Sequence, residues 1–230
     1  MTSQVQSLLC MEALDRDGFF VVHDAVPPSL LRHLFDAFST LPASHAHRNL
    51  LEFPEVRDFT ASDLARSLIV PALGATARSV RAILFDKLPG ANWKVPWHQD
   101  LSIAVQKREE VPGYGPWSIK EGVPHVQPPA EVLEHMLTLR LHLDDCFEDN
   151  GPVRVLPGTH LLGILDSASI QRLRTSTPEV AAVTPAGGVL LMRPLLLHAS
   201  SPALAPAHRR VLHIEYAAMD LPVPLRWHAA

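Results

Sequence analysis

The chain is poor in the features that mark secreted, membrane and nucleic-acid-binding proteins. Its 230 residues include only two cysteines, Cys10 and Cys146, which allow no disulfide framework and have no metal-type spacing. The net charge is −4, so no global basicity points to nucleic acid or to an anionic membrane. The N-terminal residues lack the basic region and apolar run of a secretory signal. We therefore expect a cytoplasmic protein.

Long hydrophobic runs, internal repeats and low-complexity linkers are also missing. The longest apolar run, Val189 to Leu197, is interrupted by Arg193 and Pro194 and is too short to cross a bilayer. Because no linker divides the chain, we expect a single domain over residues 1–230. An all-β barrel with flanking helices fits this length.

Proline, by contrast, is abundant, and 21 prolines indicate the short connections of a loop-rich β architecture. We expect helical and strand support over about residues 1–78, followed by a barrel core over about 79–219. Hydrophobic spacing predicts helices over Leu30–Leu41, Ser62–Ile69 and Ser167–Arg174, with a loop over Leu51–Asp58. It predicts strands over Gly18–Val26, Val80–Leu88, Val95–Val105, Met136–Leu143, Pro152–Leu156, Val189–Met192 and Arg209–Ala217.

Residues 107–134 lose this periodicity and gather proline, glycine and charge. At about 28 residues the segment exceeds common loop lengths, so it is either a functional lid or disordered. Its most distinctive members are Tyr114, Trp117 and His125. We expect a lid-like insertion here, with Trp117 as a candidate substrate contact.

Three segments fit the metal-binding pattern His-x-Asp/Glu, namely His98-Gln99-Asp100, His142-Leu143-Asp144 and His213-Ile214-Glu215. Residues i and i+2 of a strand share a face, so each pair offers two ligands to one ion. With 13 histidines in the chain, chance matches are expected. The pattern alone therefore does not select a site.

The surroundings of the three pairs differ. Thr138 to Asp144 simply alternates polar and apolar residues, as a half-buried strand does, and its polar face is either solvated or lines a cavity. His213 and Glu215 share a face with Arg209, which suits groups that support a site. At His98 and Asp100, polar residues interrupt an apolar strand, which favours this pair as metal ligands.

Downstream residues strengthen that choice. His198 closes an apolar segment and is followed by Ser200 and then by Arg209, at the start of a strand. A buried arginine needs an anionic partner, and a carboxylate matches its planar fork best. The rival histidine, His160, has no such arginine after it.

Together these residues resemble the phytanoyl-CoA dioxygenase family of non-haem Fe(II) and 2-oxoglutarate dependent oxygenases. The resemblance rests on Trp97-His98-Gln99-Asp100, on His198, Ser200 and Arg209 with their spacing, and on the stretch Asn150 to His160. It covers roughly Arg81 to Ala217, with a weaker match at Asp17-Gly18-Phe19. It implies a double-stranded β-helix, a jelly-roll barrel that periodicity alone does not distinguish from other barrels.

The resemblance also implies chemistry. His98, Asp100 and His198 are expected to hold Fe(II), while 2-oxoglutarate binds the metal and reaches Arg209 and Ser200 with its far carboxylate. Lys87 is a further candidate contact to this cosubstrate, or a solvated lysine at a strand end. With dioxygen, such enzymes convert 2-oxoglutarate to succinate and CO₂ and hydroxylate a substrate. The carboxylate of Asp100 disfavours halogenation, because relatives that halogenate carry a small residue there.

The substrate is not determined by these motifs. Arg140 and His142 are candidate contacts to an acidic or polar substrate group, if their face points into the barrel. No basic patch suggests a coenzyme A headgroup, so a small polar molecule or natural product is favoured, with no nucleic-acid or membrane partner. The oligomeric state stays open, as do two alternatives: a non-catalytic barrel that binds a metabolite or senses 2-oxoglutarate, and a cupin dioxygenase that does not use it.

Overall fold

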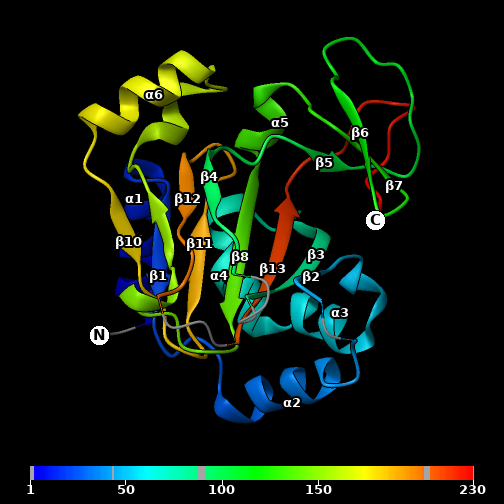
Figure 1. Cartoon of the computed structure of the whole chain (residues 1–230). Coiled ribbons are helices and arrows are strands. Elements are labelled where there is room, and N and C mark those ends of the chain that lie inside the picture. The colour runs from blue at the N-terminus through cyan, green and yellow to red at the C-terminus, as the bar shows by residue number, and fades with distance from the viewer. Residues whose placement is uncertain (1–2, 43, 88–91, 205–207, 230) are drawn as a thin grey trace.

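The structure is a computed structural model that describes residues 3–42, 44–87, 92–204 and 208–229. It consists mainly of antiparallel sheets with flanking helices, as expected (Figure 1). The largest sheet has six strands in the order β1-β11-β8-β13-β3-β2. Their bounds are Phe19–Val22 (β1), Val189–Met192 (β11), Met136–His142 (β8), Arg209–Ala217 (β13), Arg78–Lys87 (β3) and Ala46–His47 (β2).

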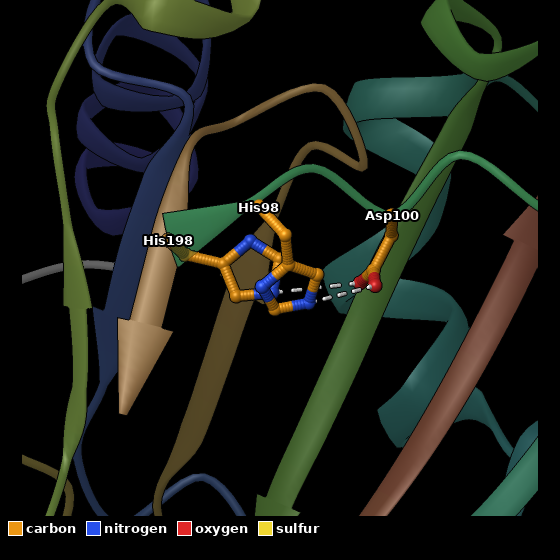
Figure 2. Close-up of side chains that lie close together, drawn as sticks. All are labelled: His98, Asp100 and His198. Carbon is orange, nitrogen blue, oxygen red and sulfur yellow. Dashed lines mark ion pairs between the residues drawn. The ribbon is translucent and has the colours of Figure 1, made fainter. Parts of the chain in front are cut away.

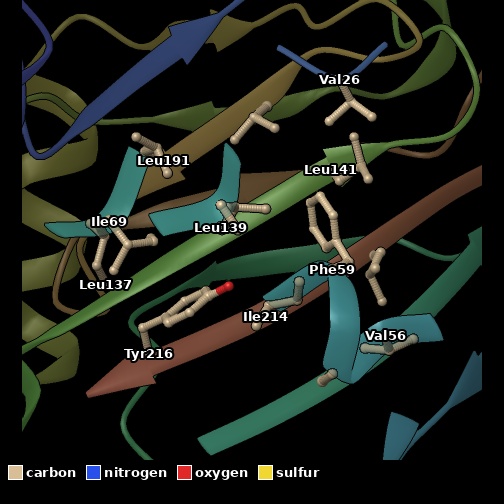
Figure 3. Packing of buried hydrophobic residues seen from close by; sticks show 14 of the residues in the cluster. Val26, Val56, Phe59, Ile69, Leu137, Leu139, Leu141, Leu191, Ile214 and Tyr216 are labelled. Carbon is tan, nitrogen blue, oxygen red and sulfur yellow. The ribbon is translucent and has the colours of Figure 1, made fainter. Parts of the chain in front are cut away.

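Alternation along the central strands separates a core face from a cavity face. Leu137, Leu139 and Leu141 of β8 belong to the main hydrophobic core, whereas the polar residues between them point the opposite way. The same holds on β13, where Ile214 and Tyr216 lie in the core (Figure 3). The face bearing Arg140 is buried, so this polar face points inward and is not solvated.

Helices cover the outer face of the large sheet and close this core (Figure 1). Their bounds are Ser3–Arg16 (α1), Pro28–Phe38 (α2), Pro54–Ala61 (α3) and Asp63–Leu73 (α4). The predicted helices at Leu30–Leu41 and Ser62–Ile69 are confirmed with shifted ends. Ser62 caps α4 by accepting a hydrogen bond from the Ala65 amide, and the helix continues through Pro71.

The predicted loop over Leu51–Asp58 was wrong. The structure has a 3₁₀ turn at Leu50–Glu52 (η1) and then α3, which begins with Pro54 in its first turn. Val56 and Phe59, three residues apart, are its buried contacts. Eight residues carry too few apolar positions for a helical period to stand out, although proline at the first helical position was an available signal.

A second sheet faces the first one and forms the other wall of the barrel (Figure 1). Its order is β10-β9-β12-β4, with bounds Val180–Ala182 (β10), Val153–Val155 (β9), His198–Ser200 (β12) and Val95–His98 (β4). Val153, Val155 and Ala182 pack against Leu190 and Met192 of the large sheet. On β12 and β4, His198 pairs with His98, which brings two histidines from distant parts of the chain to adjacent positions.

Within residues 107–134, strands β6 (Trp117–Lys120) and β7 (Val123–Val126) form a hairpin, followed by the short helix α5 (Ala130–Glu134). β7 also pairs with β5 (Ile103–Ala104), so a three-stranded sheet stands at one end of the barrel (Figure 1). Val105, Val126 and Trp227 form its core. The segment is thus folded, which excludes the disordered alternative.

The remaining elements connect the sheets. They are the 3₁₀ turns Glu148–Asn150 (η2) and Thr159–Leu162 (η3) and the predicted helix α6, Ser167–Ser176. Most predicted strands are confirmed with shifted ends, and the terminal residue of the predicted strand Val80–Leu88 lies outside the described residues. The prediction of one strand over Val95–Val105 was wrong, because the chain leaves β4 after His98 and enters β5 of another sheet at Ile103. Among the residues that the structure describes, no helix is both long and apolar enough to cross a membrane.

Candidate functional site

The structure brings His98, Asp100 and His198 together, as predicted. One donor atom from each of them lies within 4.8 Å of the other two. The Nε2 atoms of His98 and His198 lie 3.6 and 3.7 Å from the Asp100 carboxylate oxygens, and all three side chains point toward a common position (Figure 2). Within the described residues, no other group of three histidine, cysteine or acidic side chains meets this spacing.

Backbone carbonyls fix the orientation of both imidazoles. His98 Nδ1 lies 2.8 Å from the Pro96 carbonyl, and His198 Nδ1 lies 2.9 Å from the Leu196 carbonyl. Because a carbonyl only accepts, each Nδ1 must carry the proton, and each Nε2 is left with a free lone pair. Two neutral imidazoles and one carboxylate form the donor set of a two-histidine, one-carboxylate iron site. The residues present therefore fit Fe(II).

The charges at this group suit metal binding. Burial lowers the pKa of His198 to about 4 and keeps it neutral. Burial also acts to lower the pKa of His98, but the hydrogen bond and charge of Asp100 outweigh it and raise that pKa. Burial opposes ionisation of Asp100, yet the two histidines hold its pKa well below the usual value. The carboxylate is therefore ionised at neutral pH.

The other His-x-Asp/Glu pairs do not form such a group. Asp144 turns away from His142 and receives two hydrogen bonds from the Arg210 guanidinium. His213 and Glu215 lie 3.4 Å apart but are joined to Arg140 and Arg81 instead. The rival His160 does not join the triad and packs against Gly18, where a Cβ would lie 2.5 Å from its ring.

A second polar group, formed by Lys87, Ser200 and Arg209, lies in the same cavity of about 250 Å³. We call it the inner cationic site. Lys87 donates to the Ser200 hydroxyl at 2.8 Å and to the Ser201 carbonyl at 2.6 Å. With 2% of its surface exposed, Lys87 is not the solvated strand-end lysine of the alternative interpretation. Arg209, paired with Lys87 across β13 and β3, is likewise buried.

Gly151 holds the base of the inner cationic site. Its carbonyl accepts hydrogen bonds from the Arg209 guanidinium and, at 3.4 Å, from the Ser200 hydroxyl. Its φ of +62° lies in the left-handed region, and a Cβ there would meet the Ser201 carbonyl oxygen at 2.4 Å. In the sequence, an Asn-Gly pair such as Asn150-Gly151 indicates only a tight turn. The structure adds a direct role in positioning Arg209.

Like charges are crowded at this end of the cavity. Burial and then the charge of Arg209 lower the pKa of Lys87 to about 8. The same two causes lower the pKa of Arg140 to about 10. Buried cations of this kind need an anion, and a carboxylate of a bound ligand provides one.

The three candidate substrate contacts lie in different places. Arg140 lines the cavity and donates to His213 Nδ1 at 2.8 Å. His142 is buried on the same face of β8 but is absent from the cavity wall, and neither of its ring nitrogens has a partner among the described residues. Trp117 packs against the core of the three-stranded sheet, beside Arg108, and does not reach the cavity.

Sequence reasoning missed several residues of the cavity wall. Arg81 on β3 pairs with Glu215 at 2.9 Å, and Lys120 on β6 donates to Ser102 at 2.8 Å. Arg48, next to β2, contacts Glu121. For Arg81 a signal was available, because Arg81, Ile83, Phe85 and Lys87 alternate along one strand face and all line the cavity. Lys120 and Arg48 come from outside the barrel, and no local pattern places them there.

The fold is shared with solved structures of low sequence identity. AviO1 from Streptomyces viridochromogenes Tue57 is 22% identical, with a TM-score of 0.66 over 94% of this chain and 96% of that one. SnoK from nogalamycin biosynthesis is 15% identical, with a TM-score of 0.73 over 96% and 87%. EctD from S. alaskensis is 20% identical, with a TM-score of 0.72 over 97% and 80%. These likenesses confirm the expected double-stranded β-helix.

Comparison with curated protein sequences gives no match. The profile of the family described as "Phytanoyl-CoA dioxygenase (PhyH)" matches residues 14–211. This range includes the metal-binding triad, the inner cationic site and the stretch from Asn150 to His160 on which the resemblance rested. The chain belongs to the phytanoyl-CoA dioxygenase family.

Proposed function

We propose that this protein is an Fe(II)- and 2-oxoglutarate-dependent oxygenase that hydroxylates a small molecule. The observation that carries the proposal is one cavity lined by both the His98–Asp100–His198 triad and the inner cationic site. Three protein donors leave coordination positions of the metal open for cosubstrate and dioxygen. A cation pair deep in the same cavity suits the second carboxylate of 2-oxoglutarate.

Each group of the chain has a distinct task in this proposal. The Pro96 and Leu196 carbonyls hold both imidazoles with Nε2 toward the metal. Arg209 and Lys87 bind the far carboxylate of 2-oxoglutarate, and the Ser200 hydroxyl adds a hydrogen bond. The bound metal and cosubstrate supply the oxidising power, with succinate and CO₂ as products of 2-oxoglutarate. Burial of the cations keeps water from competing for their charge.

Related solved structures support this assignment but leave the outcome open. EctD has been solved with bound Fe and with 2-oxoglutarate and 5-hydroxyectoine, and SnoK is described as an alpha ketoglutarate dependent carbocyclase. We propose hydroxylation for this chain, with Arg140 as a substrate contact. We further propose that residues 107–134 act as the substrate-facing segment, since Lys120 from this segment lines the cavity.

The test is succinate release with Fe(II), 2-oxoglutarate and dioxygen, for the native protein and for Arg209→Ala. We expect the variant to need about a hundredfold more 2-oxoglutarate, because truncating one partner of a buried charge pair costs roughly 2–5 kcal/mol. Arg154→Gln is the control, since Arg154 pairs with Glu179 away from the cavity.

Two results would contradict the proposal. No succinate and no metal-dependent 2-oxoglutarate binding by the native protein would favour a non-catalytic barrel. Metal-dependent oxidation that is independent of 2-oxoglutarate and unchanged in Arg209→Ala would favour a cupin dioxygenase that binds its substrate directly.

A further inference from the structure

The cavity carries more positive charge than the proposed cosubstrate needs. Among the described residues its wall has six lysine or arginine side chains and two carboxylates. The cations are Arg48, Arg81, Lys87, Lys120, Arg140 and Arg209, and the carboxylates are Asp100 and Glu215. Asp100 belongs to the metal triad, Lys87 and Arg209 belong to the inner cationic site, and Arg140 is held by His213. Arg48, Arg81 and Lys120 remain, and we call them the outer cationic cluster.

The outer cationic cluster and the inner cationic site lie at opposite ends of the same strand pair. Lys87 is paired with Arg209, and Arg81 with Glu215, six residues further along β3 and β13. At about 3.3 Å per residue, the two positions are roughly 20 Å apart along the strands. His213 lies between them on the same face of β13 and is close enough to Asp100 for their charges to interact. A molecule bound at the outer cluster therefore faces the metal triad from the side opposite 2-oxoglutarate.

Three separate segments bring the outer cations together. Arg81 comes from β3, Arg48 follows β2, and Lys120 ends β6 of the three-stranded sheet. The side chains of Arg48 and Arg81 are 24% and 12% exposed, so both are largely shielded from water. Burial and then the charge of Arg81 lower the pKa of Lys120, which shows that the cations interact.

The carboxylates near the outer cationic cluster do not neutralise its charge. Glu215 is shared between Arg81 and His213, and Glu121, the partner of Arg48, is half-exposed. Lys120 lines the cavity and its Nζ donates to the Ser102 hydroxyl, which uses one of the three donors of the ammonium group. The Arg48 Nε atom is buried without a partner among the described residues. Cations held together in this way are stabilised when an anion enters.

We propose that the outer cationic cluster binds an oxyanion of the substrate, a carboxylate or a phosphate, and so orients the substrate toward the metal. The inference rests on the proposed function, because that function assigns 2-oxoglutarate to the inner site. It deepens the function by naming the substrate class. The substrate is an acid whose charged group is held at the cavity mouth while its reacting carbon faces the triad.

The test measures binding of inorganic phosphate and acetate to the full chain loaded with Mn(II) and saturated with 2-oxoglutarate. Relaxation of the phosphate ³¹P and acetate ¹³C signals by Mn(II) reports ions held near the metal, and using both ions separates tetrahedral from planar ligands. The variants are Arg48→Gln and Lys120→Gln, singly and combined. Glutamine removes the charge but keeps a polar, uncharged side chain, and Arg81 is left in place because it pairs with buried Glu215. Lys107→Gln is the control, since Lys107 is exposed on the same segment.

We expect the combined variant to bind phosphate, acetate or both about tenfold more weakly, since it loses two cations that donate charge-assisted hydrogen bonds to the ion. The control and the affinity for 2-oxoglutarate should be unchanged. The inference is overturned if the native protein and the combined variant bind each ion with the same affinity, or if the ion displaces 2-oxoglutarate. Failure of the proposed function looks different: 2-oxoglutarate then shows no metal-dependent binding, whereas ion binding still depends on Arg48 and Lys120.

Discussion

At the inner end of the cavity, Lys87 and Arg209 stand on two paired strands of the large sheet and are 2% and 5% exposed. At the outer end, Arg48 directly follows the edge strand β2 and Lys120 ends β6 of the three-stranded sheet, and Arg48 is partly exposed. Both ends of the cavity are therefore positively charged, but different segments of the chain carry the charges. The inner end is fixed by the barrel itself, which suits the 2-oxoglutarate site proposed there. The outer end depends on peripheral segments, which can change without rebuilding the barrel.

The largest expected effect comes from removing charge at the inner end. Lys87→Met should weaken 2-oxoglutarate binding by about a hundredfold, because one partner of a buried charge pair is lost at a cost of roughly 2–5 kcal/mol. The free energy of unfolding of the ligand-free protein should not fall, since the repulsion between Lys87 and Arg209 is removed. Isothermal titration and chemical denaturation measure the two quantities. An unchanged affinity for 2-oxoglutarate would show that Lys87 does not bind this cosubstrate.

Gly151→Ala should damage the inner end through the backbone. The substitution places a Cβ 2.4 Å from the Ser201 carbonyl at a φ of +62°, and strain of this kind costs about 1–3 kcal/mol. Gly158→Ala is the matched control, because Gly158 is also left-handed, with a φ of +78°, but the nearest atom to its added Cβ lies at an ordinary contact distance of 3.5 Å. We expect denaturation to show a larger loss for Gly151→Ala, together with weaker 2-oxoglutarate binding. Equal losses without a change in binding would mean that the carbonyl of residue 151 does not position Arg209.

The inner end should also respond to pH. Lys87 has a pKa lowered to about 8, so it is charged below that pH and neutral above it. Affinity for 2-oxoglutarate should therefore fall by up to about tenfold as the pH rises from 7 to 9, as expected for one group that binds in its protonated form. Titrations across this range on native protein and Lys87→Met measure it. Persistence of the same slope in the variant would assign the effect to another group.

The smallest effect is expected when charges of the outer cationic cluster are removed and the affinity for 2-oxoglutarate at the inner cationic site is measured. Arg48→Gln and Lys120→Gln should alter 2-oxoglutarate affinity by less than about twofold, because partly exposed charges at this distance are screened by solvent and salt. Titration at physiological ionic strength checks this. A tenfold loss of affinity for 2-oxoglutarate would show that both ends of the cavity bind this one ligand and are not separate sites.

The inner end was largely predictable from the sequence. Arg209, Ser200 and Lys87 lie on strands, and strand alternation fixes which side chains share a face. The same rule placed Arg140 and His142 on one face of β8, but it left open whether that face was solvated, and it did not show that only Arg140 reaches the cavity. His98, Asp100 and His198 were chosen over two similar pairs because of Arg209 and the family resemblance.

The outer end was not predictable in the same way. Residues 107–134 were expected to act through aromatic side chains, but Trp117 packs into a local core while Lys120 from the same hairpin reaches the cavity. On β6 these two residues are three positions apart and therefore on opposite faces. The alternation was present, but which face meets the barrel depends on how the hairpin docks.

The sequence determined the order of the strands and three similar His-x-Asp/Glu pairs, because these follow from local periodicity and spacing, and the family resemblance then favoured His98 and Asp100. The tertiary structure decided that His98 and His198 lie side by side, since β4 and β12 come together from positions about a hundred residues apart. It also decided that Arg48, Arg81 and Lys120 form one cluster. Contacts between segments distant in the chain depend on packing and register, and no local pattern specifies them.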